Sequence, residues 1–275
     1  MRRRGVTIVA GVGIAVALLW TLVPLVWMAI SSFKNQTDVT AAAPSLHFGP
    51  TLENWTGLFS GGDAIGRNLV NSLVVALGST VLSVVLGTMA GYGLARSRMR
   101  RKKDLAFWVI SVRMAPIAAV ILPLFLMFRF LGLIDTLPGL IVAYLTFNLP
   151  FAIWLMSAFF AQVPVSLEES ARVDGAGHWR TFLQISLPLV KSGLVTTAVL
   201  CLVFAWNDYA FATVFAGPDA QTLPVAASRL VTSTGIDWGR MTAIGTIVVV
   251  PMMVAGLAVR RWLVTGLTLG AVTGE

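Results

Sequence analysis

Long apolar runs, separated by shorter polar segments, are the dominant pattern along this chain. Six runs are long enough to cross a bilayer, since about 20 apolar helical residues span a hydrocarbon core ~30 Å thick. They lie at about residues 6–31, 69–95, 105–131, 136–160, 189–216 and 241–262. The alternation of apolar and polar residues that is typical of membrane barrel strands is absent. Because backbone groups in hydrocarbon must bond within their own segment, each run is predicted to be a helix, and the fold class to be all-α.

Composition supports a chain that is largely embedded in lipid. The sequence is 57% hydrophobic and 12% charged, whereas a soluble domain carries roughly 25% charged residues. We therefore expect one polytopic transmembrane domain over residues 1–275. The first run follows an arginine cluster, as in a signal peptide, but extends to about Ile30. That exceeds the apolar core of a signal peptide, about 7–15 residues, so an uncleaved first span is predicted.

The distribution of basic residues predicts the orientation. The net charge is +8, but Lys and Arg cluster at the ends of apolar runs, which indicates membrane topology rather than a nucleic-acid partner. With the N-terminus inside, the basic residues of both termini, of the second-to-third connection and of segment 161–191 all lie inside. The outside receives only Lys34, Arg67, Arg229 and Arg240, while Arg113 and Arg129 fall within the third run. We expect a multi-pass protein of the cell membrane with both termini cytoplasmic.

Few residues could hold a metal or a nucleotide. Cys201 is the only cysteine, and the two histidines, His47 and His178, are far apart in the sequence. No metal site is therefore predicted. The chain has no G-x-x-x-x-G-K-[ST] phosphate loop, so we expect neither enzymatic activity nor a cofactor of its own.

Segment 161–188, between the fourth and fifth runs, has a distinctive pattern. Ser166 and Glu169 have the spacing of a capping box, which predicts the start of a helix. Gly175 is suited to end that helix, and a second short helix over about 178–185 is expected to stop before Pro188. The residues alone allow two interpretations: an amphipathic connector lying on lipid, or a docking element on the cytoplasmic face.

The same segment resembles the EAA loop of ABC importer permeases. Glu169-Ser170-Ala171 is followed after three residues by Gly175, and nine residues later by Ile185-Ser186-Leu187-Pro188. Ser170 replaces the usual first alanine, a small-for-small change. The resemblance implies a coupling helix that docks on a dimeric cytoplasmic ATPase, with Glu168, Glu169 and Asp174 as anchors for basic groups. The implied ATPase-coupling residues are Glu168, Glu169, Ser170, Ala171, Asp174, Gly175, Ile185, Leu187 and Pro188.

Other motifs resemble the carbohydrate branch of these permeases, and in particular the maltose-type G subunit. They include Asn71-Ser72, Arg113-Met114-x-Pro116, Trp206-Asn207-Asp208-Tyr209, Thr222-Leu223-Pro224-Val225 and Gly266-Leu267-Thr268-x-Gly270-Ala271-Val272. The resemblance implies a second, F-type permease, an extracellular substrate-binding protein, and ATP with magnesium on the partner ATPase. A sugar or related polyol is the implied substrate.

Candidate pathway residues lie in the third and fifth runs. Arg113 stands well inside an apolar run, where a charge costs at least ~2.5–3.5 kcal/mol unless it faces protein or water. It is either a structural arginine at a helix interface or a residue of the pathway. Trp206, Asn207, Asp208 and Tyr209 combine aromatic and polar groups that suit a sugar, although helix–helix hydrogen bonding would explain them equally well. In the outer loops, 32–68 and 217–240, Gln221, Thr222, Leu223 and Pro224 are candidate contacts with the binding protein.

Small residues and prolines predict how the helices pack and bend. Gly87-x-x-x-Gly91 predicts close helix packing, and kinks or hinges are expected at Pro116, Pro123, Pro150 and Pro251.

Two other transporter classes remain as alternatives. One alternative is an ABC permease for a non-sugar solute such as glycerol phosphate. The other is an ion-coupled secondary transporter, which needs an embedded ion site and often internal repeats. Asp208 is the only acid well inside a predicted span, and no inverted repeat is visible.

Overall fold

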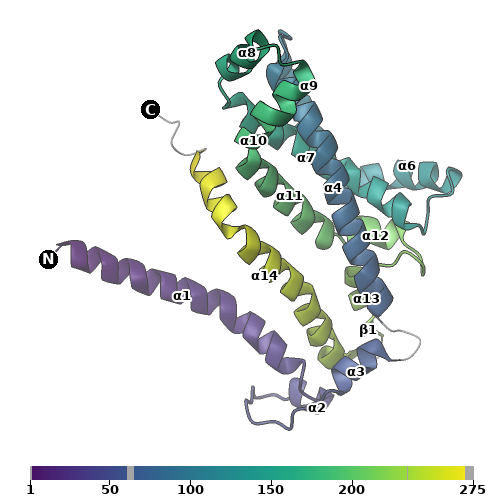
Figure 1. The fold of residues 1–275 in the computed structure, drawn as a ribbon. Helices are drawn as coiled ribbons and strands as arrows, with labels where there is room; N and C mark the ends of the chain where they lie inside the picture. The colour runs from purple at the N-terminus through teal and green to yellow at the C-terminus, as the bar shows by residue number, and fades with distance from the viewer. Residues whose placement is uncertain (1, 61–64, 234, 270–275) are drawn as a thin grey trace. The chain divides into compact units, whose positions relative to one another are not determined.

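The computed structural model describes residues 2–60, 65–233 and 235–269 (Figure 1). The chain divides into two compact units: Met1–Arg67 with Ala226–Pro251, and Asn68–Val225 with Met252–Glu275. We call them the outer-loop unit and the pathway unit. Part of the C-terminal motif noted above, Gly270-Ala271-Val272, lies outside the described residues.

Helices dominate both units, as the apolar runs predict. Four of the described helices are long and apolar enough to cross a membrane. They are Ala10–Ser31 within α1 (Arg2–Ser31), α4 (Gly66–Arg96), α7 (Leu137–Ala161) and Trp238–Leu257 within α14 (Trp238–Leu269). Two bent helix pairs raise the number of candidate spans to as many as six.

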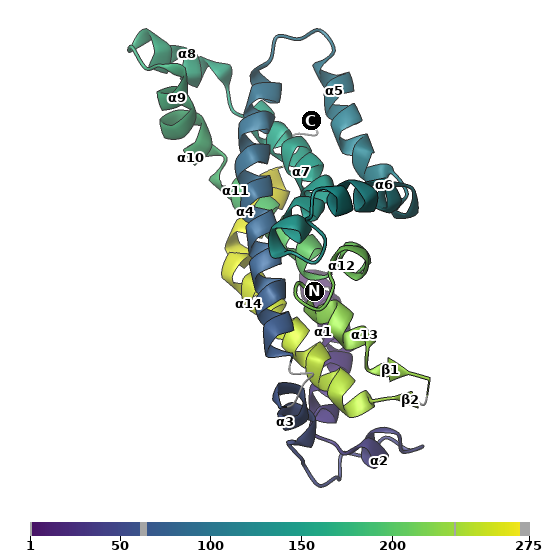
Figure 2. The ribbon, with the colours of Figure 1, turned by 90° about the vertical axis from the view of Figure 1, so that its right-hand side faces the viewer.

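The third apolar run is a bent pair rather than one helix. α5 (Lys102–Ser111) and a 3₁₀ turn, η1 (Val112–Met114), meet α6 (Ile117–Phe130) at 86° (Figure 2). The break falls at Pro116, whose ring disfavours helical geometry in the residue before it, and Ala115 is extended with ψ 133°. Three further prolines, Pro123, Pro150 and Pro251, lie inside continuous helices. The large break is therefore at only one of the four predicted positions.

The fifth run is also interrupted. α11 (Lys191–Trp206) ends before the predicted boundary at 216, and α12 (Ala210–Phe215) and α13 (Leu223–Ser228) follow. Asp208 Oδ1 accepts a hydrogen bond from the Ala212 N–H at 3.1 Å, so this acid caps the start of α12. The run predicted as one span over about 189–216 is therefore two helices, interrupted at residues 207–209.

α4 and α7 pack closely in the pathway unit. A Cβ atom added at Gly87 would lie 2.5 Å from the Ala152 Cβ, and one at Gly91 would lie 2.9 Å from the Met156 Cβ. Neither position has room for a side chain, which confirms the packing predicted from Gly87-x-x-x-Gly91. α7 also contacts α11, where Asn148 Nδ2 donates to the Cys201 carbonyl at 3.1 Å.

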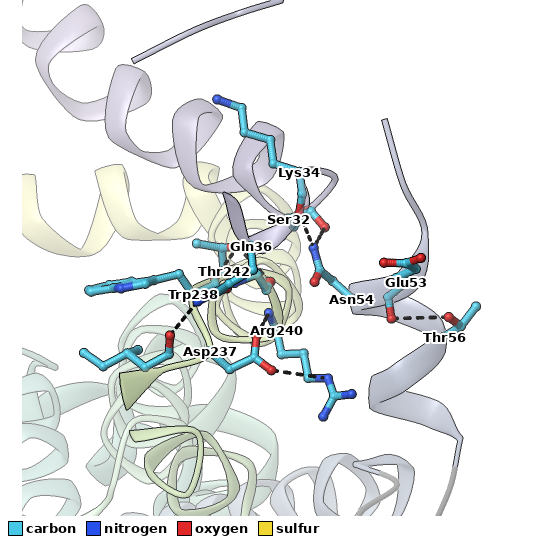
Figure 3. Close-up of polar contacts among 12 residues, drawn as sticks. Ser32, Lys34, Gln36, Glu53, Asn54, Thr56, Asp237, Trp238, Arg240 and Thr242 are labelled. Atoms are coloured by element: carbon cyan, nitrogen blue, oxygen red, sulfur yellow. Dashed lines mark hydrogen bonds and ion pairs between the residues drawn. The ribbon is translucent and has the colours of Figure 1, made fainter. Parts of the chain in front are cut away.

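The outer-loop unit has a folded connection after α1. This connection contains α2 (Gln36–Val39) and α3 (Glu53–Phe59). The unit also contains a small hairpin of β1 (Val231–Thr232) and β2 (Gly235–Ile236). Figure 3 shows the amide of Asn54 pointing at the turn after α1, where Nδ2 donates to the carbonyls of Ser32 and Lys34 at 2.9 and 2.7 Å. The buried Lys34 ammonium donates to the Ser45 carbonyl and lies over the Trp27 ring. These side-chain donors satisfy backbone carbonyls of the loop that have no partner within a long helix.

Candidate functional site

The connection between α7 and α11, residues 162–190, is called the α7–α11 loop below. Its first helix, α8 (Val165–Val173), ends at Gly175, which has φ +87°. The Ala176 N–H bonds the Ala171 carbonyl at 2.9 Å across this turn. The helix and its glycine stop are confirmed. The capping box is wrong, because the helix begins after Pro164 and no side chain caps its start.

The second half of the loop is a continuous helical segment. α9 (His178–Thr181) passes into a π-helical turn, η2 (Phe182–Ser186), and then α10 (Leu187–Leu189). The Leu187 N–H bonds the Phe182 carbonyl, five residues back. Pro188 lies in α10, near the C-terminal end of this segment. The chain then turns by 77° into α11. The break predicted at Pro188 therefore falls about two residues later, at Val190.

Most of the predicted coupling residues lie at the surface of this loop. Glu169, Ser170, Asp174, Gly175 and Pro188 are exposed, and the neighbouring Val173 side chain is 88% exposed. Ala171, Ile185 and Leu187 are partly buried. A hollow of about 180 Å³ between the two halves of the loop is lined by Ala171, Asp174, Ala176, Arg180, Gln184 and Ile185. The loop thus presents small, acidic and apolar groups together.

Glu168 has a different environment, since its side chain is 0% exposed. Its carboxylate accepts hydrogen bonds from Ser186 Oγ at 2.7 Å, Arg96 Nε at 2.7 Å and the Tyr92 hydroxyl at 3.1 Å. Burial raises the pKa of this carboxyl, but the hydrogen bonds from Ser186 and Arg96 and the arginine charge outweigh burial, so its pKa lies below the ordinary value. Glu168 is thus bound inside the chain, and the expectation that it anchors a partner's basic group is corrected.

Four of the five candidate pathway residues converge on one cavity of about 820 Å³ in the pathway unit, called the Arg113 cavity. Arg113, Asn207, Asp208 and Tyr209 line it, whereas the Trp206 side chain is only 3% exposed and does not. The remaining lining residues are mostly apolar: Val112, Ala115, Ile117, Val120, Thr146, Phe147, Val203, Phe204, Ala210 and Phe211.

The Arg113 guanidinium is held by aromatic rings. Its Cζ lies 4.0 Å from the centroid of the Phe204 ring and 4.8 Å from that of Phe151. Such cation–π contacts stabilise a charge that has few polar neighbours. Sequence reasoning missed Phe204, although in the single helix predicted over about 189–216 it lies one turn before Asp208 and on the same face.

The segment after α12 was expected to contact a binding protein, and its burial argues against that role. Gln221, Thr222 and Leu223 are all buried, and Pro224 is partly buried. Asn71 Nδ2 donates to the Gln221 carbonyl at 3.0 Å. The Leu223 N–H donates to Ser72 Oγ at 2.8 Å. These residues fasten the segment to α4 and leave little surface for a partner.

Comparison with known proteins decides the family. The profile of the binding-protein-dependent transport system inner membrane components matches residues 83–268. The chain belongs to this family. It is accordingly a permease subunit of a binding-protein-dependent ABC importer, an inner membrane component that works with a substrate-binding protein and an ATPase.

Two relatives and one solved structure extend this result. The chain is 38% identical to the trehalose transport system permease protein SugB of Mycobacterium tuberculosis, over 93% of each chain. It is 29% identical to the trehalose/maltose transport system permease protein MalG of Thermococcus litoralis, over 96% of each. A chain of a bacterial ABC transporter involved in import of the acidic polysaccharide alginate superposes with a TM-score of 0.77 at 21% identity, over 95% of this chain and 97% of that one. This last similarity supports the fold alone.

Proposed function

We propose that this permease imports a sugar or a related polyol and forms half of a translocation pathway. The observation that carries the proposal is the Arg113 cavity, where aromatic walls surround an amide, a carboxylate and a phenol. Sugars combine hydroxyl groups with apolar C–H faces, so rings such as Phe204 and Tyr209 pack against the faces. Asn207 and Asp208 bond the hydroxyls. The trehalose permeases among the relatives point to the same substrate class.

The charges in the cavity favour a neutral polar solute over a phosphate ester. Arg113 by itself would attract an anion such as glycerol phosphate, but the Asp208 carboxylate lines the same cavity. A dianion placed there would be attracted by the Arg113 guanidinium but would also face the oxygens of Asp208, which repel it. A neutral polyol meets no such repulsion and is therefore the preferred solute.

A second, F-type permease completes the pathway. Val112, Ile117 and Tyr209 line the cavity and yet are substantially exposed, so this chain alone encloses only one side. Exposed apolar side chains continue along α6, where Leu122 and Leu126 are more than half exposed. A partner of similar apolar character would close the cavity and cover part of this surface, with lipid covering the rest.

The α7–α11 loop couples the pathway to the ATPase. Its exposed α8 residues face the cytoplasm in the orientation that the basic residues favour, with six spans and both termini inside. ATP and magnesium are bound by the partner, and this chain hydrolyses nothing itself. On the outside, the exposed β1–β2 hairpin replaces the buried residues Gln221 to Leu223 as the contact for the substrate-binding protein. Val231 in this hairpin is 52% exposed.

Reconstitution into proteoliposomes with the partner subunits tests the proposal. Sugar uptake should require both ATP and the loaded binding protein, and an ion gradient should not replace ATP. Uptake driven by an ion gradient without ATP would overturn the importer mechanism in favour of a secondary transporter.

A matched pair of substitutions tests the loop. Gly175→Asp places a charged side chain on the exposed turn, where it should disturb docking of the ATPase and abolish ATP-dependent uptake while the protein still inserts. Gly177→Asp makes the same charge change two residues away, at φ −69° and at the start of α9, where aspartate is a favourable cap. It should retain most of the uptake. Equal uptake by both variants would contradict a coupling role for the turn.

A further inference from the structure

One arginine at the end of α4 bonds to three elements of the pathway unit. Arg96 is the last residue of α4. Its Nη1 donates to the Phe160 carbonyl at 3.0 Å, in the last turn of α7, and its Nη2 donates to the Val163 carbonyl at 3.0 Å, just before α8. Its Nε donates to Glu168 Oε1 at 2.7 Å, inside α8. The planar guanidinium thus uses all three of its nitrogens on three separate groups, in a fixed fork that the single nitrogen of a lysine does not reproduce.

The Glu168 carboxylate extends this connection to the second half of the loop. It accepts from Ser186 Oγ, at the end of the π-helical turn, as well as from Tyr92, one turn before Arg96. The Arg96 side chain is 13% exposed and that of Glu168 is 0% exposed. The pair is therefore largely shielded from water and from screening by salt. The π-helical turn adds a residue to the helix and so brings Ser186 to this point.

An aromatic cluster adjoins the pair through Tyr92. The Tyr92 ring lies 5.2 Å from that of Phe160 and 4.8 Å from that of Phe182. Met156 and Val190 complete the buried core of this end of the unit. The polar contacts and the packed rings therefore join the α7–α11 loop to both α4 and α7.

We propose that Arg96 is the positioning residue that makes the α7–α11 loop move as one body with α4 and α7, so that displacement of the loop by the ATPase reaches the Arg113 cavity. α7 supplies Thr146 and Phe147 to that cavity. α7 also lies against α4 without room for a single added carbon at Gly87. A displacement of α8 is then transmitted to α4 and α7. This inference rests on the proposed coupling function of the loop.

This positioning role of Arg96 is called the clamp below. It is tested by the number of solute molecules imported per ATP hydrolysed, in complexes assembled with the ATPase and the binding protein. Arg96→Gln should lower this ratio at least about fivefold, the lower end of typical coupling effects, while ATP hydrolysis continues. A residue that only stabilises the fold would reduce the amount of complex and leave the ratio unchanged. Arg98→Gln is the matched control, since it makes the same charge change two residues further along the chain at an exposed side chain. It should keep the wild-type ratio.

Two further measurements make the result decisive. If Arg96→Gln does not assemble, Arg96→Lys takes its place, because it keeps the charge beside Glu168 but loses the bonds to the two carbonyls. A wild-type ratio of solute imported to ATP hydrolysed in Arg96→Lys overturns the clamp. Val173→Cys, on the exposed face of α8, should crosslink to the ATPase with or without Arg96→Gln. Crosslinking with an unchanged ratio in Arg96→Gln overturns the clamp alone. Absence of crosslinking when Arg96 is intact overturns the coupling role of the loop, and the clamp with it.

Discussion

Asp135 shows how much a single side chain decides in this molecule. Among the described residues it is the only one other than glycine with a positive φ, at +58°. Its carboxylate accepts from the Ala220 N–H at 2.8 Å and the Asp219 N–H at 3.1 Å. Gly217 leaves room for that approach, since an added Cβ would lie 2.6 Å from Asp135 Oδ2. Aspartate both tolerates the left-handed backbone and supplies the acceptor, so it fixes the segment after α12.

The role of Asp135 gives a prediction about stability. Asp135→Ala removes the acceptor for the buried Ala220 N–H and should destabilise the protein by about 1–3 kcal/mol. Asp135→Asn keeps a carbonyl acceptor and tolerates the left-handed backbone, so it should lose much less. Thermal unfolding of the detergent-purified chain measures both. Equal melting temperatures for the two variants would show that the hydrogen bonds contribute nothing.

Glu168 gives a prediction about pH. Its pKa in the folded protein lies below the ordinary value of 4.5. A carboxyl group with a depressed pKa stabilises the fold fully at pH values above the pKa that it has in the unfolded chain. This stabilisation is lost as the pH falls through the pKa of the folded protein. The stabilisation by Glu168 should therefore be complete at neutral pH and should decline below about pH 4.5. The melting temperature of the wild type should fall more steeply on acidification than that of Glu168→Gln, and parallel curves would contradict the assignment.

Helix packing decides the structure at the scale of elements. α4 and α7 approach through glycines, and α5 and α6 separate at Pro116, although all four helices overlap the predicted apolar runs. The difference comes from backbone chemistry, because glycine removes a side chain while proline removes a donor and restricts the residue before it. The same apolar character therefore produces a tight helix pair in one place and an 86° bend in another.

The close approach of α4 and α7 predicts a position-specific effect. Gly87→Ala brings a Cβ to within 2.5 Å of the Ala152 Cβ and should destabilise the protein. Overpacking of this kind typically costs about 1–3 kcal/mol. Gly93→Ala lies on the same helix with nothing within 4 Å and should be neutral or slightly stabilising. Urea unfolding of both variants in detergent checks the difference, and a Gly87→Ala variant as stable as Gly93→Ala would mean that the helices can separate freely.

At the scale of the whole molecule, the arrangement of spans determines which surfaces meet the ATPase and which meet the binding protein. Val173 on α8 and Val231 in the β1–β2 hairpin are both well exposed. The orientation that the basic residues favour places the first inside the cell and the second outside. The only cysteine, Cys201, is buried, which makes single-cysteine labelling practicable.

Labelling tests the predicted orientation. In a Cys201→Ala background without the partner ATPase, Val173→Cys should react with a membrane-impermeant maleimide only in inside-out vesicles. Val231→Cys should react only in right-side-out cells. The reverse pattern would invert the predicted topology and move α8 away from any cytoplasmic partner. Labelling of both residues from one side would contradict the number of spans between them.

The apolar runs determined the helical membrane architecture, because length and hydropathy are local properties of the chain. The EAA-type motif likewise located α8 and the turn at Gly175, since a left-handed backbone position is favourable mainly for glycine. Family membership followed from the same motifs and is confirmed by the matching profile. Each of these conclusions depends on residues that are close together in sequence.

Tertiary structure alone decided which polar residues face inward. Glu168 and Glu169 are adjacent acids, yet Glu168 is enclosed by Arg96 and Ser186 while Glu169 is exposed. Gln221 and Leu223 look like loop residues but are buried against α4. The partners that enclose them lie 18 to 151 residues away along the chain. A local pattern does not specify such distant pairings, because they depend on how the helices pack.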